Sequence, residues 1–435
     1  MTDTNPLPQA YLVRRPKKID TADIVALATK ASAMLDEVRN SMLSPHPRKE
    51  APTFTSNQVQ RMCGIDKTRM SYVLNKEDGD LARNFPGLAQ GSGRSRIFTL
   101  AETIAWMKVE RKNRVKRPDD KEGMVLSIVN FKGGSTKSTT SMGLAQGLSL
   151  RGHRTLLIDL DPQGSSTALC SILPDAEVRE EETVLPAFHP RDSEEYVSSL
   201  EGFPIKTYWE GLDLIPACSA LFSAEFMTPA SVIHDPEFHF WAILQKAIEP
   251  LRKDYDVIII DTSPSLSYLC MNAIMAADGM IMPLPPDGLD FASSISFWNL
   301  VAELTNGFAT KGSQKTWDFI EVVMSRVDST NPGSAIIRDW IKQLYGQYAS
   351  SVEIPKSSVA GASATQFGTL YDLKPSDFST STYDRLYDAF DRFIDSIEAK
   401  LSIAWDVDPS AGQPVAPIKR VKAEKPTPSP QMPLV

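Results

Sequence analysis

The sequence predicts an α/β protein: a parallel sheet with helices on both faces, preceded by an N-terminal α-helix and a winged helix-turn-helix unit. Residues 122–400 alternate short apolar runs with helical patterns, as parallel sheets with crossover helices do. Residues 51–110 hold two short helical patterns around a glycine turn. Residues 20–43 repeat apolar side chains every three or four positions, which predicts one amphipathic helix. The 435 residues suffice for two or three domains.

These patterns divide the chain into four parts: an arm with the long helix (1–48), the helix-turn-helix unit (49–118), the α/β domain (119–405) and a Pro-rich basic tail (406–435). We expect the tail to be disordered. Residues 1–121 carry 22 Lys and Arg against 14 Asp and Glu, whereas the remainder carries 24 against 40. A basic front on an acidic body suggests contact with nucleic acid, although a basic surface that only aids solubility explains the charge equally well.

A glycine-bearing loop follows the first apolar run of the α/β domain. Residues 124–129 (MVLSIV) predict a buried strand, and a helix is expected from Ser138 to Leu150. A loop between strand and helix directs free backbone N–H groups and the positive end of the helix dipole at an anion. Lys137 can bind the β- and γ-phosphates, and Ser138 can bind Mg²⁺. The residues expected to bind ATP here are Lys132, Gly133, Gly134, Ser135, Thr136, Lys137, Ser138 and Thr139.

The loop departs from the usual G-x-x-x-x-G-K-[ST] pattern. Phe131 and Thr136 stand where its two glycines belong. Gly133 and Gly134 still allow close backbone approach, and Lys132 adds a second cation. This variant, K-G-G-x-x-K-[ST], is the deviant Walker A loop of P-loop NTPases. The alternative, a chance Gly-Gly turn, is disfavoured by the acidic motifs that follow.

Two later apolar strands end in aspartates. Residues 155–164 (TLLIDLDPQG) contain Asp159 and Asp161, and residues 256–265 (DVIIIDTSPS) contain Asp261. Such carboxylates face the crevice where α/β proteins bind ligands. We expect Asp161 to position or activate the water that attacks the γ-phosphate, Asp261 to hold Mg²⁺ through water, and Asp159 to support the water or the metal.

Two further strands are expected at residues 281–284 and 319–324. Asp328 lies just past the second, where a loop that recognises the base would fall; a plain loop residue explains Asp328 equally well.

Three motifs in order, NFKGG…KS, DLDPQG and DTSPSL, resemble the ParA family of DNA-partition ATPases, and GLDLIPA at 211–217 is similar to its larger plasmid-type ParA and RepA members. The resemblance covers about residues 122–395. It implies that Lys132 reaches across an ATP-sandwiched homodimer to the partner's phosphates, while Lys137 binds phosphate within its own subunit. It also implies that Ser138 binds Mg²⁺, that Asp161 acts in hydrolysis and that Asp261 holds the metal through water.

The resemblance also extends to Ile354-Pro355-Lys356, which matches the family's loop beside the adenine and makes Pro355 a candidate for base contact. Many relatives carry a further basic residue near this loop for non-specific DNA binding, where this chain has Val359. Lys356 and Arg338 are the candidates that we would test in its place.

The N-terminal unit is predicted from capping and turn residues. Thr55 and Asp66 can cap two helices separated by the turn Cys63-Gly64-Ile65, and the second helix would read the major groove. Residues 91–98 are typical of a basic wing and a closing helix follows; the segment 94–100 resembles MerR-like DNA-binding domains. A small helical packing domain is the alternative. The candidate DNA-binding residues are Lys67, Arg69, Tyr72, Arg94 and Arg96.

The resemblance implies a partition ATPase that represses its own operon and is stimulated by a ParB-type partner, and residues 20–43 match the family's dimerisation helix. A nucleotide-gated repressor with little turnover is the second hypothesis, and Asp161 argues against it. A MinD-like membrane ATPase needs a C-terminal amphipathic helix, which the Pro-rich tail lacks. No apolar run reaches about 18 residues, so we expect no membrane contact and a cytoplasmic, nucleoid-associated protein. The four scattered cysteines fit reduced thiols.

Overall fold

The computed structural model describes residues 19–42, 49–76, 79–90, 96–235, 238–357, 368–373, 378–408 and 413–414. It separates into two compact units, residues 1–48 and 49–435. The described part of the first unit is one helix, α1 (Thr21–Met42). Asp20 starts it, because its carboxylate accepts the backbone N–H of Asp23. Ile24 and Leu27 of the predicted apolar stripe have exposed side chains, and Met34 beside it is exposed as well.

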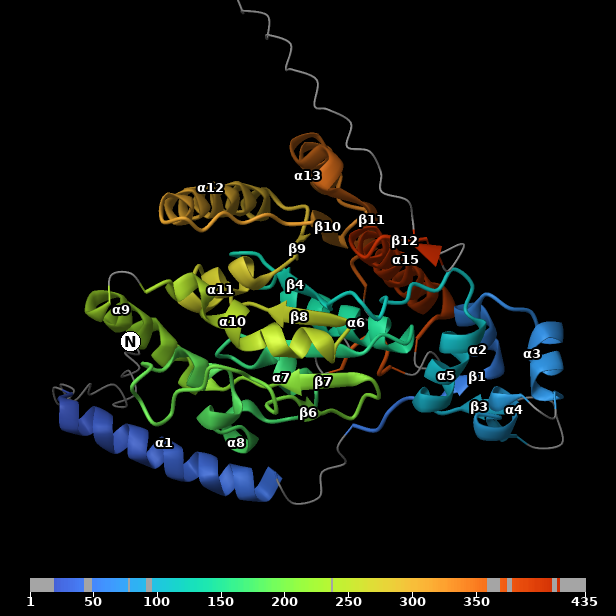
Figure 1. Ribbon diagram of the computed structural model, residues 1–435, viewed down its shortest axis with the longest axis horizontal. Helices are drawn as coiled ribbons and strands as arrows, with labels where there is room; N and C mark the ends of the chain where they lie inside the picture. The colour runs from blue at the N-terminus through green and yellow to red at the C-terminus, as the bar shows by residue number, and fades with distance from the viewer. Residues whose placement is uncertain are drawn as a thin grey trace, which may run out of the picture. The chain divides into compact units, whose positions relative to one another are not determined.

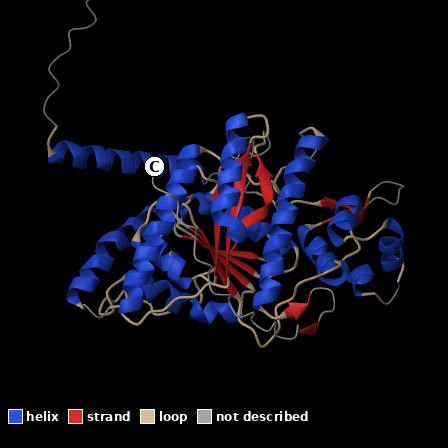
Figure 2. Cartoon of the chain, turned by 90° about the horizontal axis from the view of Figure 1, so that it is seen from above, coloured by secondary structure: helices blue, strands red, loops and turns tan. Residues whose placement is uncertain are grey.

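An eight-stranded sheet forms the middle of the second unit, and Figure 2 shows it between two layers of helices. Its order is β11-β10-β9-β4-β8-β5-β7-β6, and all neighbours are parallel except β6 and β7. The predicted mostly parallel sheet is therefore confirmed. Its strands are β4 (Met124–Ile128), β5 (Thr155–Asp159), β6 (Ile205–Lys206), β7 (Leu212–Ile215), β8 (Val257–Asp261), β9 (Gly279–Leu284), β10 (Phe319–Val327) and β11 (Ala349–Pro355).

Helices cover both faces because the strands alternate apolar side chains between them. Leu126 of β4 packs in a core with α6 (Lys137–Leu150) and α15 (Thr380–Ala404), whereas Val125 packs on the opposite face with α10 and α11. Figure 1 shows α6 and α15 on the sheet. The other helices of this part are α7 (Ser165–Leu169), α8 (Pro174–Glu177), α9 (Ala224–His234), α10 (Ile243–Ile248), α11 (Tyr268–Ala276), α12 (Gly288–Thr310) and α13 (Pro332–Tyr345).

Short 3-10 helices fill the segments between these elements: η2 (Glu180–Glu182), η3 (Leu185–Phe188), η4 (Ser219–Ser223), η5 (Phe240–Ala242), η6 (Glu249–Lys253) and η7 (Gly346–Tyr348). After α15, the strands β12 (Val407–Asp408) and β13 (Gln413–Pro414) pair antiparallel within the tail for which we expected disorder. Residues 409–412 and 415–435 of that tail lie outside the described residues. None of the described helices is long and apolar enough to cross a membrane.

The N-terminal part of the second unit has the predicted order of helices. A capping box at Thr55 starts α2 (Ser56–Cys63), Gly64 ends it in the left-handed conformation, and Asp66 caps α3 (Lys67–Leu74). Phe98 and Trp106 pack edge to face in its core. The remaining elements are β1 (Phe54–Thr55), α4 (Asp80–Asn84), β2 (Leu88–Ala89), β3 (Arg96–Phe98) and α5 (Leu100–Glu110), with the strand order β1-β3-β2.

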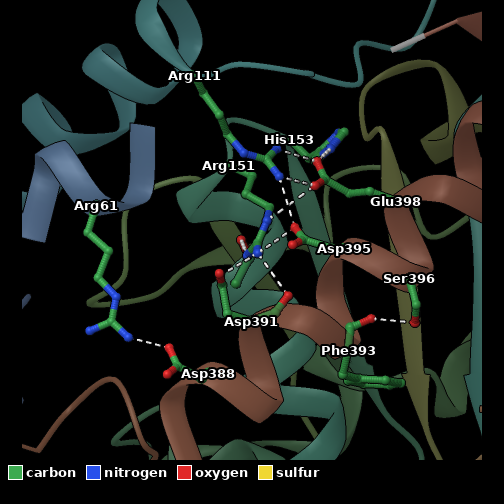
Figure 3. Close-up of polar contacts among 11 residues, drawn as sticks. Arg61, Arg111, Arg151, His153, Asp388, Asp391, Phe393, Asp395, Ser396 and Glu398 are labelled. Atoms are coloured by element: carbon green, nitrogen blue, oxygen red, sulfur yellow. Dashed lines mark hydrogen bonds and ion pairs between the residues drawn. The ribbon is translucent and has the colours of Figure 1, made fainter. Parts of the chain in front are cut away.

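A buried carboxylate joins this helical part to the sheet domain (Figure 3). Glu398 of α15 accepts hydrogen bonds from Arg111, just after α5, at 2.9 and 2.6 Å. Its carboxylate also lies 3.2 Å from the Nε of Arg151, which ends α6, and 2.9 Å from the Nε2 of His153. Because its neighbours are cationic or hydrogen-bond donors, the pKa of Glu398 is lowered to about 2 despite burial.

We predict that Glu398→Ala destabilises the protein by about 3 kcal/mol, because it leaves two buried guanidinium groups without their shared carboxylate. Thermal unfolding monitored by circular dichroism measures the change. Asp395→Ala is the matched control: Asp395 pairs with the same arginines, but half of its side chain is exposed, so we expect a loss of less than about 1 kcal/mol.

The Glu398→Ala and Asp395→Ala variants should also differ in how their stability depends on pH. Because folding lowers the pKa of Glu398, its contribution to stability is present above the unfolded value, near 4.5, and is lost as the pH falls towards 2. Equal effects of the two variants at neutral pH would contradict the assignment.

Candidate nucleotide-binding site

The loop from β4 to α6 is shaped to surround an anion. The side chain of Asn130 fixes its start, donating to the carbonyl of Pro283 at 2.8 Å and accepting the N–H of Lys132 at 3.0 Å. Gly134 has a φ of +75°. Apart from adjoining loop residues, no described atom lies within 4 Å of the place that a Cβ would take at Gly133 or Gly134. The backbone N–H groups of the loop therefore border open space in front of a helix N-terminus.

One side chain of the loop is buried without a partner. The Oγ of Ser135 has no hydrogen-bond partner among the described residues, although Ser135 is almost fully buried. Leaving such a hydroxyl unpaired costs about 1–3 kcal/mol, and a phosphate oxygen would relieve that cost. The end of β10 supports the loop from behind: the hydroxyl of Ser325 donates to the Ser135 carbonyl at 3.4 Å, and Arg326 donates to the Gly134 carbonyl at 3.2 Å.

Thr136 replaces a glycine of the usual loop and takes a glycine-like conformation. Its φ of +73° lies in the left-handed region, which is strained for a β-branched residue. We predict that Thr136→Gly stabilises the protein by about 1 kcal/mol, measured by thermal unfolding. Thr139→Gly, three residues on in the exposed first turn of α6, should instead destabilise by a few tenths of a kcal/mol. Destabilisation of the same size by both variants would refute the strain at Thr136.

The loop opens into a cavity of about 440 Å³, a size suited to a nucleotide. The cavity is lined by the predicted loop residues other than Lys132, and by the predicted Asp161. It is lined by Gly133, Gly134, Ser135, Thr136, Lys137, Ser138, Thr139, Asp161, Gln163, Ser165, Ala168, Leu169, Pro264 and Gly368.

Behind the cavity, Asp159 and Asp261 stand side by side at the ends of β5 and β8. Burial raises the pKa of both, and for Asp159 the neighbouring Asp261 adds to the shift. The Oδ2 of Asp159 accepts the backbone N–H and the hydroxyl of Thr167, both at 2.8 Å, and its Oδ1 accepts the N–H of Asp161 at 3.1 Å. Asp159 therefore fixes the turn that carries Asp161 rather than facing the cavity.

Asp261 accepts hydroxyl hydrogen bonds from Ser141 at 3.0 Å and Ser166 at 2.7 Å, and the nearby Ser138 hydroxyl opposes the rise in the pKa of Asp261. Sequence reasoning missed Ser141 and Ser166. The spacing of Ser141, one turn beyond Lys137, could have indicated the first. The hydroxyl of Ser138 and the carboxylate of Asp261 are hard oxygen donors of the kind that Mg²⁺ takes together with phosphate oxygens and water, so the residues fit this ion. Among the described residues, no cluster of three or more His, Cys, Asp or Glu could hold a metal by itself.

Lys137 is buried beneath the loop. Burial lowers the pKa of its ammonium group, while Asp261 and Asp161 oppose that shift. Its Nζ donates to the Lys132 carbonyl at 3.2 Å. A buried cation beside open space complements a bound polyphosphate.

Comparison with known proteins finds relatives that match most of the chain. Residues 123–326 match the family model described as an AAA domain. The chain is 27% identical to the protein SopA of Escherichia coli strain K12 over 76% of this chain and 83% of SopA. It is 26% identical to plasmid partition protein A of Escherichia coli over 59% of this chain and 66% of that protein. A solved structure described as a partition protein covers 88% of this chain and 98% of its own with a TM-score of 0.61 and 20% identity, which shows a shared fold.

Relatives named as partition proteins are what the resemblance to the ParA family implies. The match to the AAA domain supports ATPase activity, and the residues of the phosphate loop fit ATP and Mg²⁺ as ligands. The resemblance carried by the three sequence motifs is thereby confirmed.

The lysine that marks the ParA loop, Lys132, is held within its own subunit. Its Nζ lies 2.9 Å from the carboxylate of Asp290 and 3.9 Å from that of Asp287, both at the start of α12. Asp290 is buried, and sequence reasoning missed it. The only local signal is that Asp287-Gly288-Leu289-Asp290 follows a strand and starts a helix, as a capping segment does.

Asp328 and Pro355, the two residues considered for base contact, lie at neighbouring strand ends. Val327 and Pro355 are register partners on β10 and β11, and the carboxylate of Asp328 is 3.2 Å from the Nζ of Lys356. The hydroxyl of Thr330 also donates to Asp328 at 2.6 Å. Neither Asp328 nor Pro355 lines the cavity at the phosphate loop.

Several candidate DNA-binding cations have protein partners. Arg338 pairs with Glu353, and Lys356 pairs with Asp328. Arg69 donates to Glu110 at 2.8 and 2.9 Å and lies over the ring of Tyr72. Arg96 donates to the carbonyls of Pro86 and Gly87, so it supports the segment that leads into β2. Lys67 and Tyr72 are exposed on α3, while Arg94 lies outside the described residues.

Proposed function

We propose that this protein is a ParA-type ATPase that partitions DNA, that ATP drives its dimerisation and DNA binding, and that it represses its own operon. The observation that carries the proposal is the phosphate loop itself, where the unpaired Ser135 hydroxyl and the buried Lys137 face a nucleotide-sized cavity. The relative named plasmid partition protein A supports the biological role. The proposal places the protein in the cytoplasm, associated with the nucleoid.

The residues support a cycle that begins with ATP binding. Backbone N–H groups of the loop and the Lys137 ammonium hold the phosphates, and Ser138 with Asp261 holds Mg²⁺, which would offset phosphate charge when bound. Lys132 then exchanges Asp290 for a phosphate of the partner subunit, which makes Asp290 the resting partner of this lysine. Asp161, on the cavity wall, positions the attacking water.

A ParB-type centromere-binding protein would stimulate hydrolysis and return the dimer to monomers that release DNA. Helix α1, with exposed Ile24, Leu27 and Met34, would join two subunits. Non-specific DNA binding would use Arg338 and Lys356 after release from Glu353 and Asp328.

The helix pair α2–α3 would bind the operator through α3. We predict that Lys67→Ala lowers operator affinity severalfold and reduces by about 1 the slope of log affinity against log salt, because one phosphate contact is lost. Fluorescence anisotropy at three or more salt concentrations measures both quantities. Lys116→Ala, also exposed and basic but outside α3, is the control that should leave the slope unchanged. A slope unaltered by Lys67→Ala would contradict the assignment of Lys67 to the DNA surface.

A nucleotide-gated repressor with little turnover is the second candidate function, favoured by the presence of the helix pair itself. A retention assay separates the partition ATPase from the repressor. Cells that carry the replicon are grown without selection, with the gene intact, deleted or carrying Lys137→Ala. Expression of the downstream operon is held constant from a foreign promoter. Partition predicts loss of the replicon in the last two strains. Full retention in both strains, with operator binding intact in the Lys137→Ala protein, would support the repressor instead.

A further inference from the structure

Lys49 is the first residue of the second compact unit, and it contacts a residue that lines the nucleotide cavity. The Nζ of Lys49 donates to the Leu169 carbonyl at 2.7 Å and lies 3.1 Å from the carboxylate of Asp372. Its backbone N–H donates to the hydroxyl of Ser171 at 3.3 Å. The side chains of Lys49 and Asp372 are only 18% and 12% exposed, so the pair is shielded from water.

These contacts join two walls of the cavity. Leu169, the last residue of α7, lines one wall of the cavity. Gly368 lines a second wall and shortly precedes Asp372 in the chain. The Asp372 carboxylate in turn accepts the backbone N–H of Thr369 at 2.8 Å. Lys49 therefore connects the α7 wall to the Gly368 wall through one ammonium group.

The same carboxylate is also linked to the phosphate-loop helix. Tyr208 donates its hydroxyl to Asp372 at 2.6 Å, and the side-chain amide of Gln146 in α6 donates to the Tyr208 oxygen at 3.0 Å. The hydroxyl of Thr369 donates to the other end of Gln146 at 2.6 Å. The ring of Tyr208 also lies 5.2 Å below the Lys49 ammonium.

We propose that Lys49 is a positioning residue for nucleotide binding: through Asp372 and Leu169 it sets the spacing between the α7 wall and the Gly368 wall of the cavity. The inference rests on the assignment of that cavity to ATP. Lys49 touches none of the phosphate-loop residues in these contacts, so it acts on affinity rather than on the chemical step.

The test is steady-state ATP hydrolysis by the full-length protein. Lys49→Met keeps the length of the side chain and removes the ammonium group; we expect KM for ATP to rise roughly tenfold with kcat changed less than about twofold. Asp372→Asn should raise KM to a similar extent, and the double variant should be no worse than the more affected single variant, because both remove one interaction. Lys49→Arg, which keeps the charge and donors, should recover most of the affinity.

Two controls make the outcome decisive. Lys121→Met removes an ammonium group that also pairs with an aspartate, Asp406, but at an exposed site, and should leave KM unchanged. Thermal unfolding of each variant establishes that the protein is folded at the assay temperature. An unchanged KM in Lys49→Met, or equal losses in Lys49→Met and Lys49→Arg, would overturn the proposal.

The failure of this proposal is distinguishable from failure of the ATP site. If Lys137→Ala abolishes hydrolysis while Lys49→Met has the KM of the wild type, only the role of Lys49 is refuted. If Lys137→Ala hydrolyses ATP like the wild type, the cavity itself has been misassigned.

Discussion

Replacing Lys137 by alanine should lower ATP turnover by at least about 100-fold, the range seen when a single preorganised charge-stabilising donor is removed. Lys137 is buried beneath the loop, beside Asp161 and Asp261, and brings positive charge to a site whose other fixed charges are carboxylates. Without it, the described lining of the cavity would hold no cationic side chain to offset the charge of a polyphosphate. Steady-state hydrolysis measures the loss of turnover, and equilibrium binding of a fluorescent ATP analogue measures the loss of nucleotide affinity.

Two further variants make the Lys137 result specific. Lys137→Arg keeps the positive charge but presents a planar fork instead of a compact ammonium group, so it should remain strongly impaired. Lys116→Ala, at an exposed lysine outside the sheet domain, should hydrolyse ATP at the wild-type rate. Wild-type turnover by Lys137→Ala would refute the site.

Asp161→Asn should bind ATP yet hydrolyse it at least about 100-fold more slowly, the lower range for loss of a residue that positions or deprotonates the nucleophile. The Oδ1 of Asp161 accepts the N–H of Gln163 at 3.0 Å, and asparagine can keep that bond, so the loop should retain its shape. Because hydrolysis is blocked, the ATP-bound dimer should accumulate, and sedimentation velocity with ATP and Mg²⁺ measures it.

The matched control for Asp161 is Asp175→Asn. Asp175 also accepts a backbone N–H, from Ser219 at 2.8 Å, but does not line the cavity, so turnover should be unaffected. If Asp161→Asn loses ATP binding together with hydrolysis, Asp161 has a structural role instead of the proposed one.

Local sequence signals were sufficient for the centre of the sheet. The strands β4, β5 and β8 are mostly apolar and wholly buried, and each runs into a motif, so their places and the adjoining loops could be predicted. The strands β9 and β10 were expected from their apolar runs as well. The edge strands were not: β6 has two residues and β11 mixes Ser, Glu and Val, so their strand character comes from pairing with neighbours.

In the site too, contacts between residues close in sequence could be predicted, whereas contacts between distant residues could not. The phosphate loop is contiguous in sequence, and its glycines and lysines could be assigned directly. The pair of Lys132 with Asp290 joins residues 158 positions apart, and the hydrogen bond from Arg326 to Gly134 spans 192 positions. Both depend on the order β10-β9-β4 in the sheet, which residue spacing does not determine. Lys49 is still further from Asp372 along the chain.

The most direct test of a partition ATPase is the hydrolysis rate of the full-length protein with ATP and Mg²⁺, measured alone, with DNA, and with DNA plus the ParB-type partner. We predict a slow basal rate that rises when both DNA and the partner are present. The rise should be lost in Lys132→Gln, whose side chain cannot supply charge to a second subunit's phosphates. A rate that is the same in all three conditions, or an equal rise in Lys132→Gln, would contradict a partition ATPase whose site is completed by its dimer partner.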